Sequence, residues 1–390
     1  MLKVLHISTG NLYGGIEILL ATLARSGALE PGLSHEFALG SPGKIEQELR
    51  DEGAAVHLYG KARLSRPWTV ARARRRMREI IDAARPDVAI THSTWPHTVF
   101  APAVRRAGVG LAFWLHDMYN PGLLMDRASR LTKPDVIIAN SRFNGEASAG
   151  RQFPGVPWEA NPSASPAPRI ADVAAVRRNL RRELGTAEDA TVIVQTSRFD
   201  RWKGHTQFID AATRLRDLPG WEIWLCGGVQ RPHEQGLVDE LKATAAAGGI
   251  ADRVKYLGQR SDVPHVLASA DIHCQANLSP EPLGLTFVEA LYAGLPCVSM
   301  RMGGAREIIT EECGILVPPG DVEGVAAALR TLILDPSHRA RLGAAGPARA
   351  RALCDPALHL RRLRQMLEPI ARRRAGVAPR SVDPIPAAPR

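Results

Sequence analysis

Short apolar, β-rich runs alternate with amphipathic stretches along most of the chain, and this alternation restricts the fold more than any other feature. Strands that alternate with helices predict βαβ units and a parallel sheet. Several runs are continuously apolar, which is typical of strands buried on both faces. In the first half we expect strands at residues 3–8, 35–39, 56–59, 87–91, 110–115 and 135–139. Helices are expected near residues 16–26, 44–52, 70–84, 97–107 and 122–131.

A proline-rich segment, residues 154–168, interrupts the alternation and shows no periodicity, so we interpret it as an interdomain linker. The alternation then restarts, with strands expected at 191–196, 221–226, 254–257, 272–275, 297–300 and 315–317. Helices are expected near 173–184, 205–215, 234–246, 263–268, 285–293, 322–334 and 336–352. A chain of 390 residues is long enough for two domains. We predict two doubly wound α/β domains facing across a cleft, with ligands bound there at the carboxyl ends of the strands.

The expected boundaries follow from the same pattern. An N-terminal domain covers 1–155, the linker 156–168 and a C-terminal domain 169–354. Residues 355–374 are expected to form a helix that could return to the N-terminal domain, and 375–390 a disordered tail rich in Pro, Ala and Arg. No apolar run is long enough for a transmembrane helix, and the N-terminus lacks a secretory signal pattern. The five cysteines are scattered, which favours reduced thiols and a cytoplasmic location.

The net charge of +10 is concentrated in two segments. Residues 61–85 hold nine lysines and arginines against two acids, and residues 361–390 hold eight arginines against two acids. In 61–85, Trp68 precedes a run of arginines with interspersed apolar positions, the pattern of a basic amphipathic helix that can rest on anionic lipid. The alternative is an ordinary solvated face. Nucleic-acid binding is disfavoured because the segment has little aromatic interleaving and no known module.

The turn after the first strand contains Gly14 and Gly15. Paired glycines before a helix let backbone N–H groups approach an anion. The turn is not G-x-G-x-x-G, and no P-loop motif occurs in the chain, so NAD binding and P-loop chemistry are disfavoured. A tight turn with close helix packing is the alternative.

Two cations, Arg198 and Lys203, follow the first strand of the second half. Because they leave the carboxyl end of a parallel strand five residues apart, one loop can bring both to a diphosphate. The alternative is two solvated surface cations.

The most specific pattern is a pair of glutamates, Glu281 and Glu289, separated by a loop and a helix start. Leu285 and Thr286 would begin the helix, and their N–H groups would be unpaired donors suited to phosphate. Two carboxylates could also form the acid and nucleophile pair of a glycoside hydrolase. The plainest alternative is an ordinary helix with Glu289 exposed.

Taken together and in this order, these motifs resemble the retaining glycosyltransferases of family 4, which have the GT-B fold. The resemblance is densest from about residue 190 to 330. It includes the E-x7-E pattern with an interior glycine, the following 293–298, and the segments 303–308 and 314–321. It also includes Arg198…Lys203-Gly204, the Gly14-Gly15 turn and His116-Asp117. The sequence departs from the family at Ser197, where glycine is common, and in the linker.

The resemblance implies a role for each candidate residue. Arg198 and Lys203 would hold the diphosphate of a nucleotide-sugar, together with the amides of Leu285 and Thr286. Glu289 would accept hydrogen bonds from the ribose, and Glu281 would contact donor-sugar hydroxyls. His116 would lie near the anomeric carbon, where it could donate to a hydroxyl of the donor sugar. Gly14 and Gly15 would let the first domain close over the phosphates and sugar.

The implied function is transfer of a sugar, with retention, from a nucleotide-diphosphate sugar to a hydroxyl of a saccharide or lipid-linked acceptor. No cofactor is expected. No metal ion is expected either, because the chain has no D-x-D pair and the cations and helix start would take the ion's place. The location would be cytoplasmic, with peripheral contact at the inner face of the membrane through 61–85. Alternatives are a nucleotide-sugar epimerase or a sugar phosphorylase of the same fold, and a non-catalytic nucleotide-sugar-binding module.

Overall fold

The computed structural model describes residues 1–10, 14–229 and 232–374, and the chain forms two compact units. Among the described residues, unit 1 contains those of Met1–Asn140, Asn144–Asn161 and Pro356–Arg374. Unit 2 contains Ser141–Phe143 and Pro162–Asp355. The predicted tail, 375–390, lies outside the described residues.

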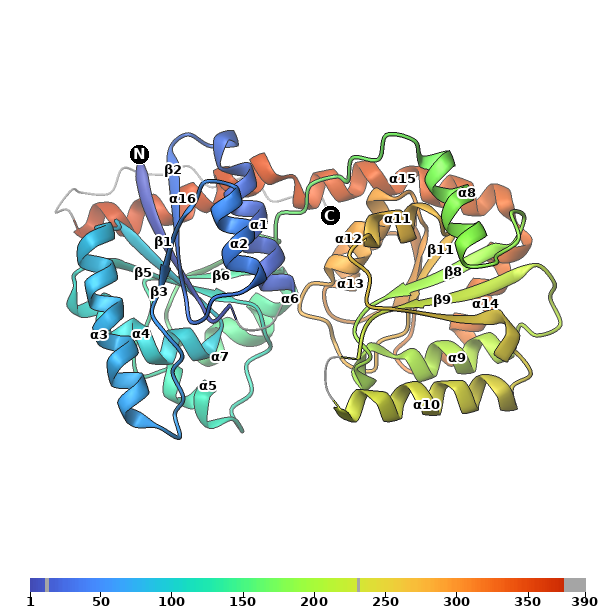
Figure 1. Cartoon of the computed structure of the whole chain (residues 1–390), viewed down its shortest axis with the longest axis horizontal. Coiled ribbons are helices and arrows are strands. Elements are labelled where there is room, and N and C mark those ends of the chain that lie inside the picture. Colours follow the sequence, from blue (N-terminus) through green and yellow to red (C-terminus); the bar gives the residue numbers. More distant parts are fainter. Residues whose placement is uncertain (11–13, 230–231, 375–390) are drawn as a thin grey trace. The chain divides into compact units, whose positions relative to one another are not determined.

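Among the described residues of unit 1, seven parallel strands form one sheet in the order β3-β2-β1-β4-β5-β6-β7 (Figure 1). The direction of strand order reverses between β1 and β4, which makes their carboxyl ends the place where ligands of such sheets bind. The strands are β1 (Leu2–Ser8), β2 (Leu33–Leu39), β3 (Ala55–Leu58), β4 (Val88–His92), β5 (Gly110–Leu115), β6 (Val136–Ala139) and β7 (Trp158–Ala160).

Helices cover both faces of this sheet because successive strand residues point to opposite sides. Val4 and Phe37 pack with α1, α2 and α16 on one face, whereas Leu5 and Ile7 pack with α3 and α4 on the other. The helices of unit 1 are α1 (Gly15–Ser26), α2 (Lys44–Asp51), α3 (Pro67–Ala84), α4 (Thr94–Arg106), α5 (Leu124–Ser129), α7 (Gly150–Gln152) and α16 (Pro356–Arg374). Of the short helix α6 (Arg142–Asn144), the first two residues are assigned to unit 2 and Asn144 to unit 1.

The part of unit 2 that the structure describes contains six parallel strands in the order β10-β9-β8-β11-β12-β13. Here the order reverses between β8 and β11. The strands are β8 (Thr191–Thr196), β9 (Trp221–Cys226), β10 (Val254–Gly258), β11 (Ile272–Gln275), β12 (Cys297–Met300) and β13 (Gly314–Val317). The helices are α8 (Val173–Glu183), α9 (His205–Thr213), α10 (Pro232–Ala247), α11 (Val263–Ala268), α12 (Leu285–Tyr292), α13 (Ala305–Ile308), α14 (Val322–Leu334) and α15 (Pro336–Cys354).

The structure differs from the expected elements in three places. Trp158–Ala160, expected in the linker, is strand β7, and its pairing with β6 begins where the Ile137 N–H donates to the Pro157 carbonyl. A three-residue edge strand among prolines carries no readable period, so the linker prediction from 156 is wrong there. The short helices α6 and α7, which follow β6, were not predicted, and neither was α13. Segments of three to five residues cannot show a helical repeat.

Candidate functional site

The two predicted cations lie in the loop that follows β8, at the carboxyl end of the strand beside the reversal point of unit 2. The Arg198 guanidinium lies 3.5 Å from the Asp200 carboxylate and is more than one-third exposed. Lys203 ends a short 3₁₀ turn, Arg201–Lys203, which Gly204 closes with a left-handed φ of 74°. The short turn and Gly204 therefore lead the chain from β8 directly into α9, which begins at His205.

Lys203 forms an ion pair with Glu281 that the sequence did not predict. The Lys203 ammonium lies 2.8 and 2.6 Å from the two Glu281 carboxylate oxygens, and both side chains are only 13% exposed. The amides of Gln275 and Asn277 donate to the same carboxylate at 3.3 and 3.4 Å. The pair therefore ties the loop after β8 to the loop after β11, and much of the hydrogen-bonding capacity of Glu281 is used within the protein.

The start of α12 lies against the end of β8. The Thr286 hydroxyl oxygen is 2.6 Å from that of Thr196 and 3.1 Å from His273 Nε2. Gly284 has a φ of 97° at the N-cap, and the structure shows no hydrogen-bond acceptor for the backbone N–H groups of Leu285 and Thr286 among the described residues. Because the first amides of a helix have no partner within it, these two are available to an anion.

Glu289 lies one turn into α12, and its pKa is shifted by its surroundings. Burial raises the pKa of Glu289 to about 7, although the side chain keeps some exposure. No described residue makes a hydrogen bond or ion pair with its carboxylate. A desolvated carboxylate without a partner at a sheet's reversal point has the properties of a ligand-binding group.

Close backbone approaches hold these loops together, and they explain glycines whose role the sequence left open. A Cβ on Gly204 would lie 1.7 Å from the Ala276 carbonyl oxygen. A Cβ on Gly303 would lie 2.4 Å from the Glu281 carbonyl oxygen, which also accepts the Gly304 N–H at 2.8 Å. Only glycine fits at such distances, so the Gly303-Gly304 pair supports the loop that carries Glu281.

The remaining predicted residues belong to unit 1. Gly14 is the N-cap of α1, and its N–H donates to the Glu17 carboxylate at 3.0 Å; Gly15 is the first helical residue. His116 follows the carboxyl end of β5, and its Nε2 lies 3.0 Å from His92 Nδ1. Burial lowers the pKa of His116 to about 3, so its ring is neutral.

The structure therefore brings Lys203 and Glu281 into direct contact and places Arg198, Leu285, Thr286 and Glu289 on the adjoining β8 loop and α12. Gln275, Asn277 and His273, which support this arrangement from β11 and its loop, were missed by sequence reasoning. A buried amide or imidazole inside an apolar strand carries no local signal of its role.

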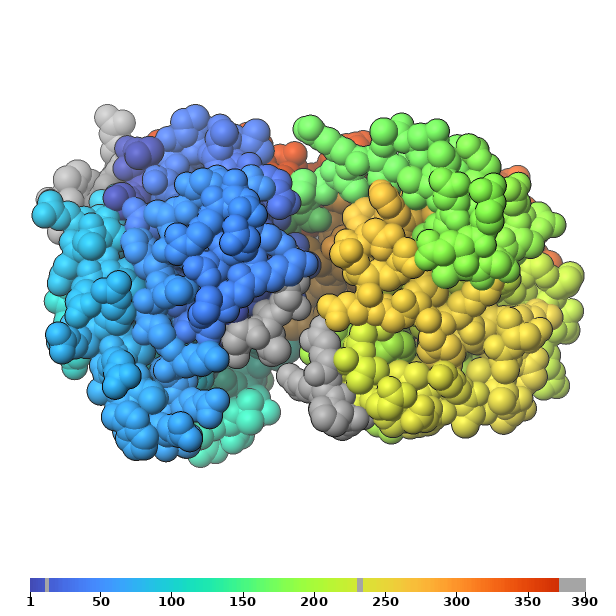
Figure 2. Space-filling model, in the orientation of Figure 1, coloured from blue at the N-terminus to red at the C-terminus, as the bar shows by residue number. Residues whose placement is uncertain are grey.

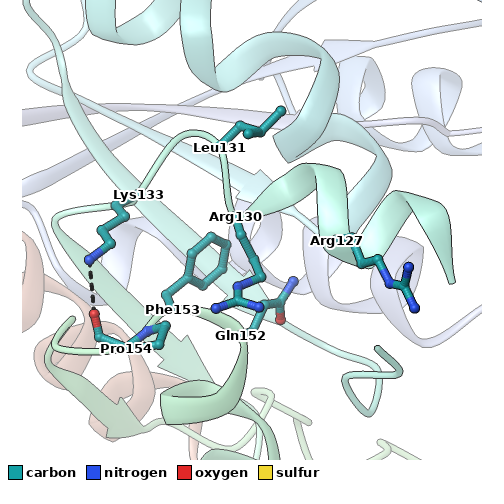
Figure 3. A pocket seen from close by; sticks show the side chains of 7 residues that line it. All are labelled: Arg127, Arg130, Leu131, Lys133, Gln152, Phe153 and Pro154. Atoms are coloured by element: carbon teal, nitrogen blue, oxygen red, sulfur yellow. Dashed lines mark hydrogen bonds between the residues drawn. The ribbon is translucent and has the colours of Figure 1, made fainter. Parts of the chain in front are cut away.

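A surface pocket of unit 1, with a volume of about 470 Å³, lies elsewhere (Figure 3). Its lining residues are Arg127, Arg130, Leu131, Lys133, Gln152, Phe153 and Pro154. The Lys133 ammonium donates to the Pro154 carbonyl at 3.1 Å. These residues precede β6 and β7, so the pocket opens at the amino ends of the strands, away from the edge where parallel sheets bind ligands. None of the predicted site residues lines it.

Known proteins resemble this chain in both halves. The family model described as Glycosyl transferases group 1 matches residues 176–349, and the model described as Glycosyltransferase Family 4 matches residues 13–195. A lipopolysaccharide core biosynthesis glycosyltransferase, LpsE of Rhizobium meliloti, is 35% identical over 168 residues, which are 43% of this chain and 46% of LpsE. A GDP-mannose-dependent alpha-(1-6)-phosphatidylinositol monomannoside mannosyltransferase of Mycolicibacterium smegmatis is 26% identical over 80% of this chain and 85% of its own.

The match to LpsE spans about half the length of that relative. Among solved structures, Anabaena Alr3699/HepE in complex with UDP has a TM-score of 0.80 at 24% identity, covering 94% of this chain and 100% of its own. A glycosyltransferase from Rickettsia africae has a TM-score of 0.82 at 18% identity, covering 95% and 98%. These likenesses confirm the predicted fold class, GT-B with two doubly wound α/β domains. The two family models together span residues 13–349, and by them the chain contains group 1 and family 4 glycosyltransferase domains.

Proposed function

We propose that this chain is a retaining, metal-independent glycosyltransferase that moves a sugar from a nucleotide-diphosphate sugar to a hydroxyl of a saccharide or lipid-linked acceptor. The observation that carries the proposal is the arrangement at the reversal point of unit 2. The loop after β8 carries two cations, and α12 carries both the unpaired amides at its start and the desolvated carboxylate of Glu289. This set suits a nucleotide diphosphate, whose phosphates need cations and N–H donors and whose ribose offers hydroxyls.

Each residue then has a distinct task in donor binding. Arg198 and Lys203, with the amides of Leu285 and Thr286, neutralise the diphosphate. Glu289 accepts hydrogen bonds from the ribose hydroxyls. Their donation to the carboxylate offsets its lost hydration and lowers its pKa on binding. For the Gly14-Gly15 turn we propose a backbone contact with phosphate or sugar, because a backbone without side chains can approach such groups closely.

Catalysis in this proposal is mainly electrostatic. Breaking the bond between the anomeric carbon and the phosphate oxygen develops negative charge on the diphosphate, which fixed cations and N–H dipoles stabilise. The acceptor hydroxyl attacks from the face that the diphosphate leaves, and a donor phosphate oxygen takes its proton, which retains the configuration. The Lys203 ion pair supports a binding role for Glu281 over a nucleophilic one, because a carboxylate that accepts three hydrogen-bond partners is a weak nucleophile.

The names of relatives support the acceptor class. LpsE is named for lipopolysaccharide core biosynthesis, and the Mycolicibacterium smegmatis relative is named a GDP-mannose-dependent phosphatidylinositol monomannoside mannosyltransferase. We propose a hexose donor and a lipid-linked or saccharide acceptor for this chain. A thermal-shift screen with UDP, GDP, ADP and their sugars identifies the base, because a ligand at a hundredfold excess over its Kd stabilises the fold by about 2.7 kcal/mol.

The central test removes the cations. We expect Arg198→Ala and Lys203→Ala each to lower turnover by roughly 10²–10³, the scale of losing one oxyanion donor. Release of nucleoside diphosphate, with and without acceptor, is the measurement. The exposed Arg301, at the end of β12, gives the control variant Arg301→Ala, which should keep wild-type turnover. Near-normal activity in both cation variants contradicts the diphosphate role. A second experiment measures the wild-type activity in EDTA. Loss of that activity, restored by Mg²⁺ or Mn²⁺, contradicts metal independence. Binding without turnover under any acceptor would favour the non-catalytic module.

We also propose a peripheral contact between α3 and an anionic membrane surface. Val70, Ala73, Met77, Ile80 and Ile81 are buried against the sheet, whereas every arginine of 61–85 is exposed. Trp68 is 63% exposed at the start of the helix, and α3 forms part of the surface of unit 1 visible in Figure 2. Polybasic contacts contribute about 1 kcal/mol per cation near such a surface. Within the described residues, no helix combines the length and apolarity needed to cross a bilayer.

Liposome sedimentation tests this contact. We expect the chain to pellet with vesicles that contain anionic lipid at low salt and to stay in the supernatant with neutral vesicles. A variant with Arg72, Arg75 and Arg78 changed to Gln should lose the difference while keeping its melting temperature. Equal recovery in the supernatant with both kinds of vesicle discards the membrane proposal.

A further inference from the structure

A row of four histidines crosses the sheet of unit 1, and each ring is hydrogen-bonded to the next. His35 Nδ1 lies 2.9 Å from His6 Nε2, and His6 Nδ1 lies 3.0 Å from His92 Nε2. His92 Nδ1 lies 3.0 Å from His116 Nε2. We call these four residues the histidine row. Every link joins a δ1 nitrogen to an ε2 nitrogen, so the row has a direction from His35 to His116.

The register of the sheet produces the row. Each histidine lies two residues beyond the strand partner of the preceding one, as shown by the pairs His35–Val4, His6–Ile90 and His92–Trp114. Steps of two residues keep all four side chains on one face of the sheet, at diagonal positions that aromatic rings can reach. The row therefore runs from within β2 to the carboxyl end of β5, the edge at which parallel sheets bind ligands.

All four rings are neutral at pH 7. Burial lowers the pKa of His35 to about 4 and of His116 to about 3, and it lowers the pKa values of His6 and His92 well below their ordinary range. A neutral imidazole carries one proton, on one of its two nitrogens. A row that keeps every hydrogen bond has only two arrangements: all four rings protonated on Nδ1, or all four on Nε2.

The far end of the row distinguishes these arrangements. His35 Nε2 is buried, and the structure shows no partner for it among the described residues. A proton there would be a buried N–H without an acceptor, which proteins avoid more strictly than a bare acceptor atom. His116 is only partly buried, so a proton on its Nδ1 can be accepted by water or by a ligand. The Nδ1–H arrangement is therefore favoured along the whole row.

We propose that His35, His6 and His92 are positioning residues that hold His116 in its Nδ1–H form, so that it presents a hydrogen-bond donor to an oxygen of the donor sugar. The inference rests on the proposed function in one respect, the placement of His116 near the sugar. The Trp114 ring stacks on His116, with centroids 5.7 Å apart and planes 12° apart, and so fixes the ring plane while the row fixes the proton. A donor held in this way needs no reorganisation when the sugar binds.

The first test reads the tautomers directly. In protein labelled with ¹⁵N-histidine, two-bond ¹H–¹⁵N spectra distinguish a protonated from a bare ring nitrogen. We expect His116 to show a protonated Nδ1 and a bare Nε2 in the wild-type chain. A His116 signal with the proton on Nε2 overturns the proposal, whether or not an active donor is known.

Two substitutions of His92 form a matched pair. His92→Leu removes the N–H that donates to His116, whereas His92→Asn keeps an amide N–H near the position of Nδ1. We expect the Leu variant to lose the single Nδ1–H form of His116 and the Asn variant to keep it. His97→Leu is the control, because His97 is equally buried in unit 1 but is bonded to Thr91 and Thr132, outside the row.

Kinetics separate positioning from folding. We expect His92→Leu to lower kcat/KM by about 10- to 100-fold, the effect of losing one buried hydrogen bond, with the Kd for the nucleoside diphosphate unchanged. His92→Asn should recover most of the loss. A changed tautomer with unchanged kcat/KM overturns the positioning role but leaves the proposed function intact. Absence of turnover in the wild-type chain with every donor contradicts the proposed function, and the spectra still decide the tautomer. If His92→Leu does not fold, the wild-type spectrum and the His35→Phe variant, which removes the far end of the row, decide instead.

Discussion

Replacing Glu289 by glutamine should stabilise the fold and weaken nucleotide binding at the same time. Burial raises the pKa of Glu289 to about 7 from an ordinary 4.5, a difference that corresponds to about 3 kcal/mol at full effect. The side chain keeps some exposure to solvent, which screens the penalty, so we expect about 1–2 kcal/mol. Glutamine has the shape of the protonated acid and carries no charge to desolvate.

The sign of the pH dependence follows from the raised pKa. The folded protein holds the Glu289 proton more tightly than the unfolded chain, so this contribution to stability is present below pH 4.5 and is lost as the pH rises through about 7. Glu289→Gln should therefore raise the melting temperature by about 2–8 °C at pH 8 and have little effect near pH 4.5. Its Kd for the nucleoside diphosphate should rise about 10- to 100-fold, since a hydrogen bond to a charged group is lost.

Thermal unfolding at both pH values and calorimetric titration with UDP and GDP measure the two effects. Glu311→Gln is the matched control, because Glu311 is an exposed glutamate of the same unit. A stability gain of equal size at both pH values would refute the burial argument. Unchanged nucleotide affinity would refute the ribose role of Glu289 without touching that argument.

Two further substitutions test how the loops of unit 2 are held. Glu281→Gln should lower the free energy of unfolding by about 1–3 kcal/mol, because it leaves the Lys203 ammonium poorly compensated at 13% exposure; a stability gain in urea unfolding would contradict this. Gly204→Ala should lower the melting temperature severely, because its Cβ would lie 1.7 Å from the Ala276 carbonyl oxygen. Gly185→Ala, at φ 62° with no atom within 4 Å, should cost only the left-handed backbone strain, about 1 kcal/mol. Equal losses in the two glycine variants would show that the contact is unimportant.

In the candidate site, the sequence pattern predicts which residues take part, and packing decides which of them contact one another. Arg198, Lys203, Glu281 and Glu289 could be chosen as candidates because each follows or begins an element at the carboxyl edge of a predicted sheet. The ion pair between Lys203 and Glu281 could not be foreseen, since the two residues are 78 positions apart and meet only when β8 and β11 pair. That pairing changes the expectation for Glu281, whose oxygens are already engaged inside the protein.

By itself the sequence determined the class of fold and most of its elements, because buried strands and amphipathic helices have different periods that a chain must display locally. The histidine row could come only from the tertiary structure. His6, His35, His92 and His116 are scattered over more than a hundred residues, and in sequence each is a lone histidine in or after an apolar run. Register between strands is a property of pairing, and it decided that their ring nitrogens lie within hydrogen-bond distance of one another.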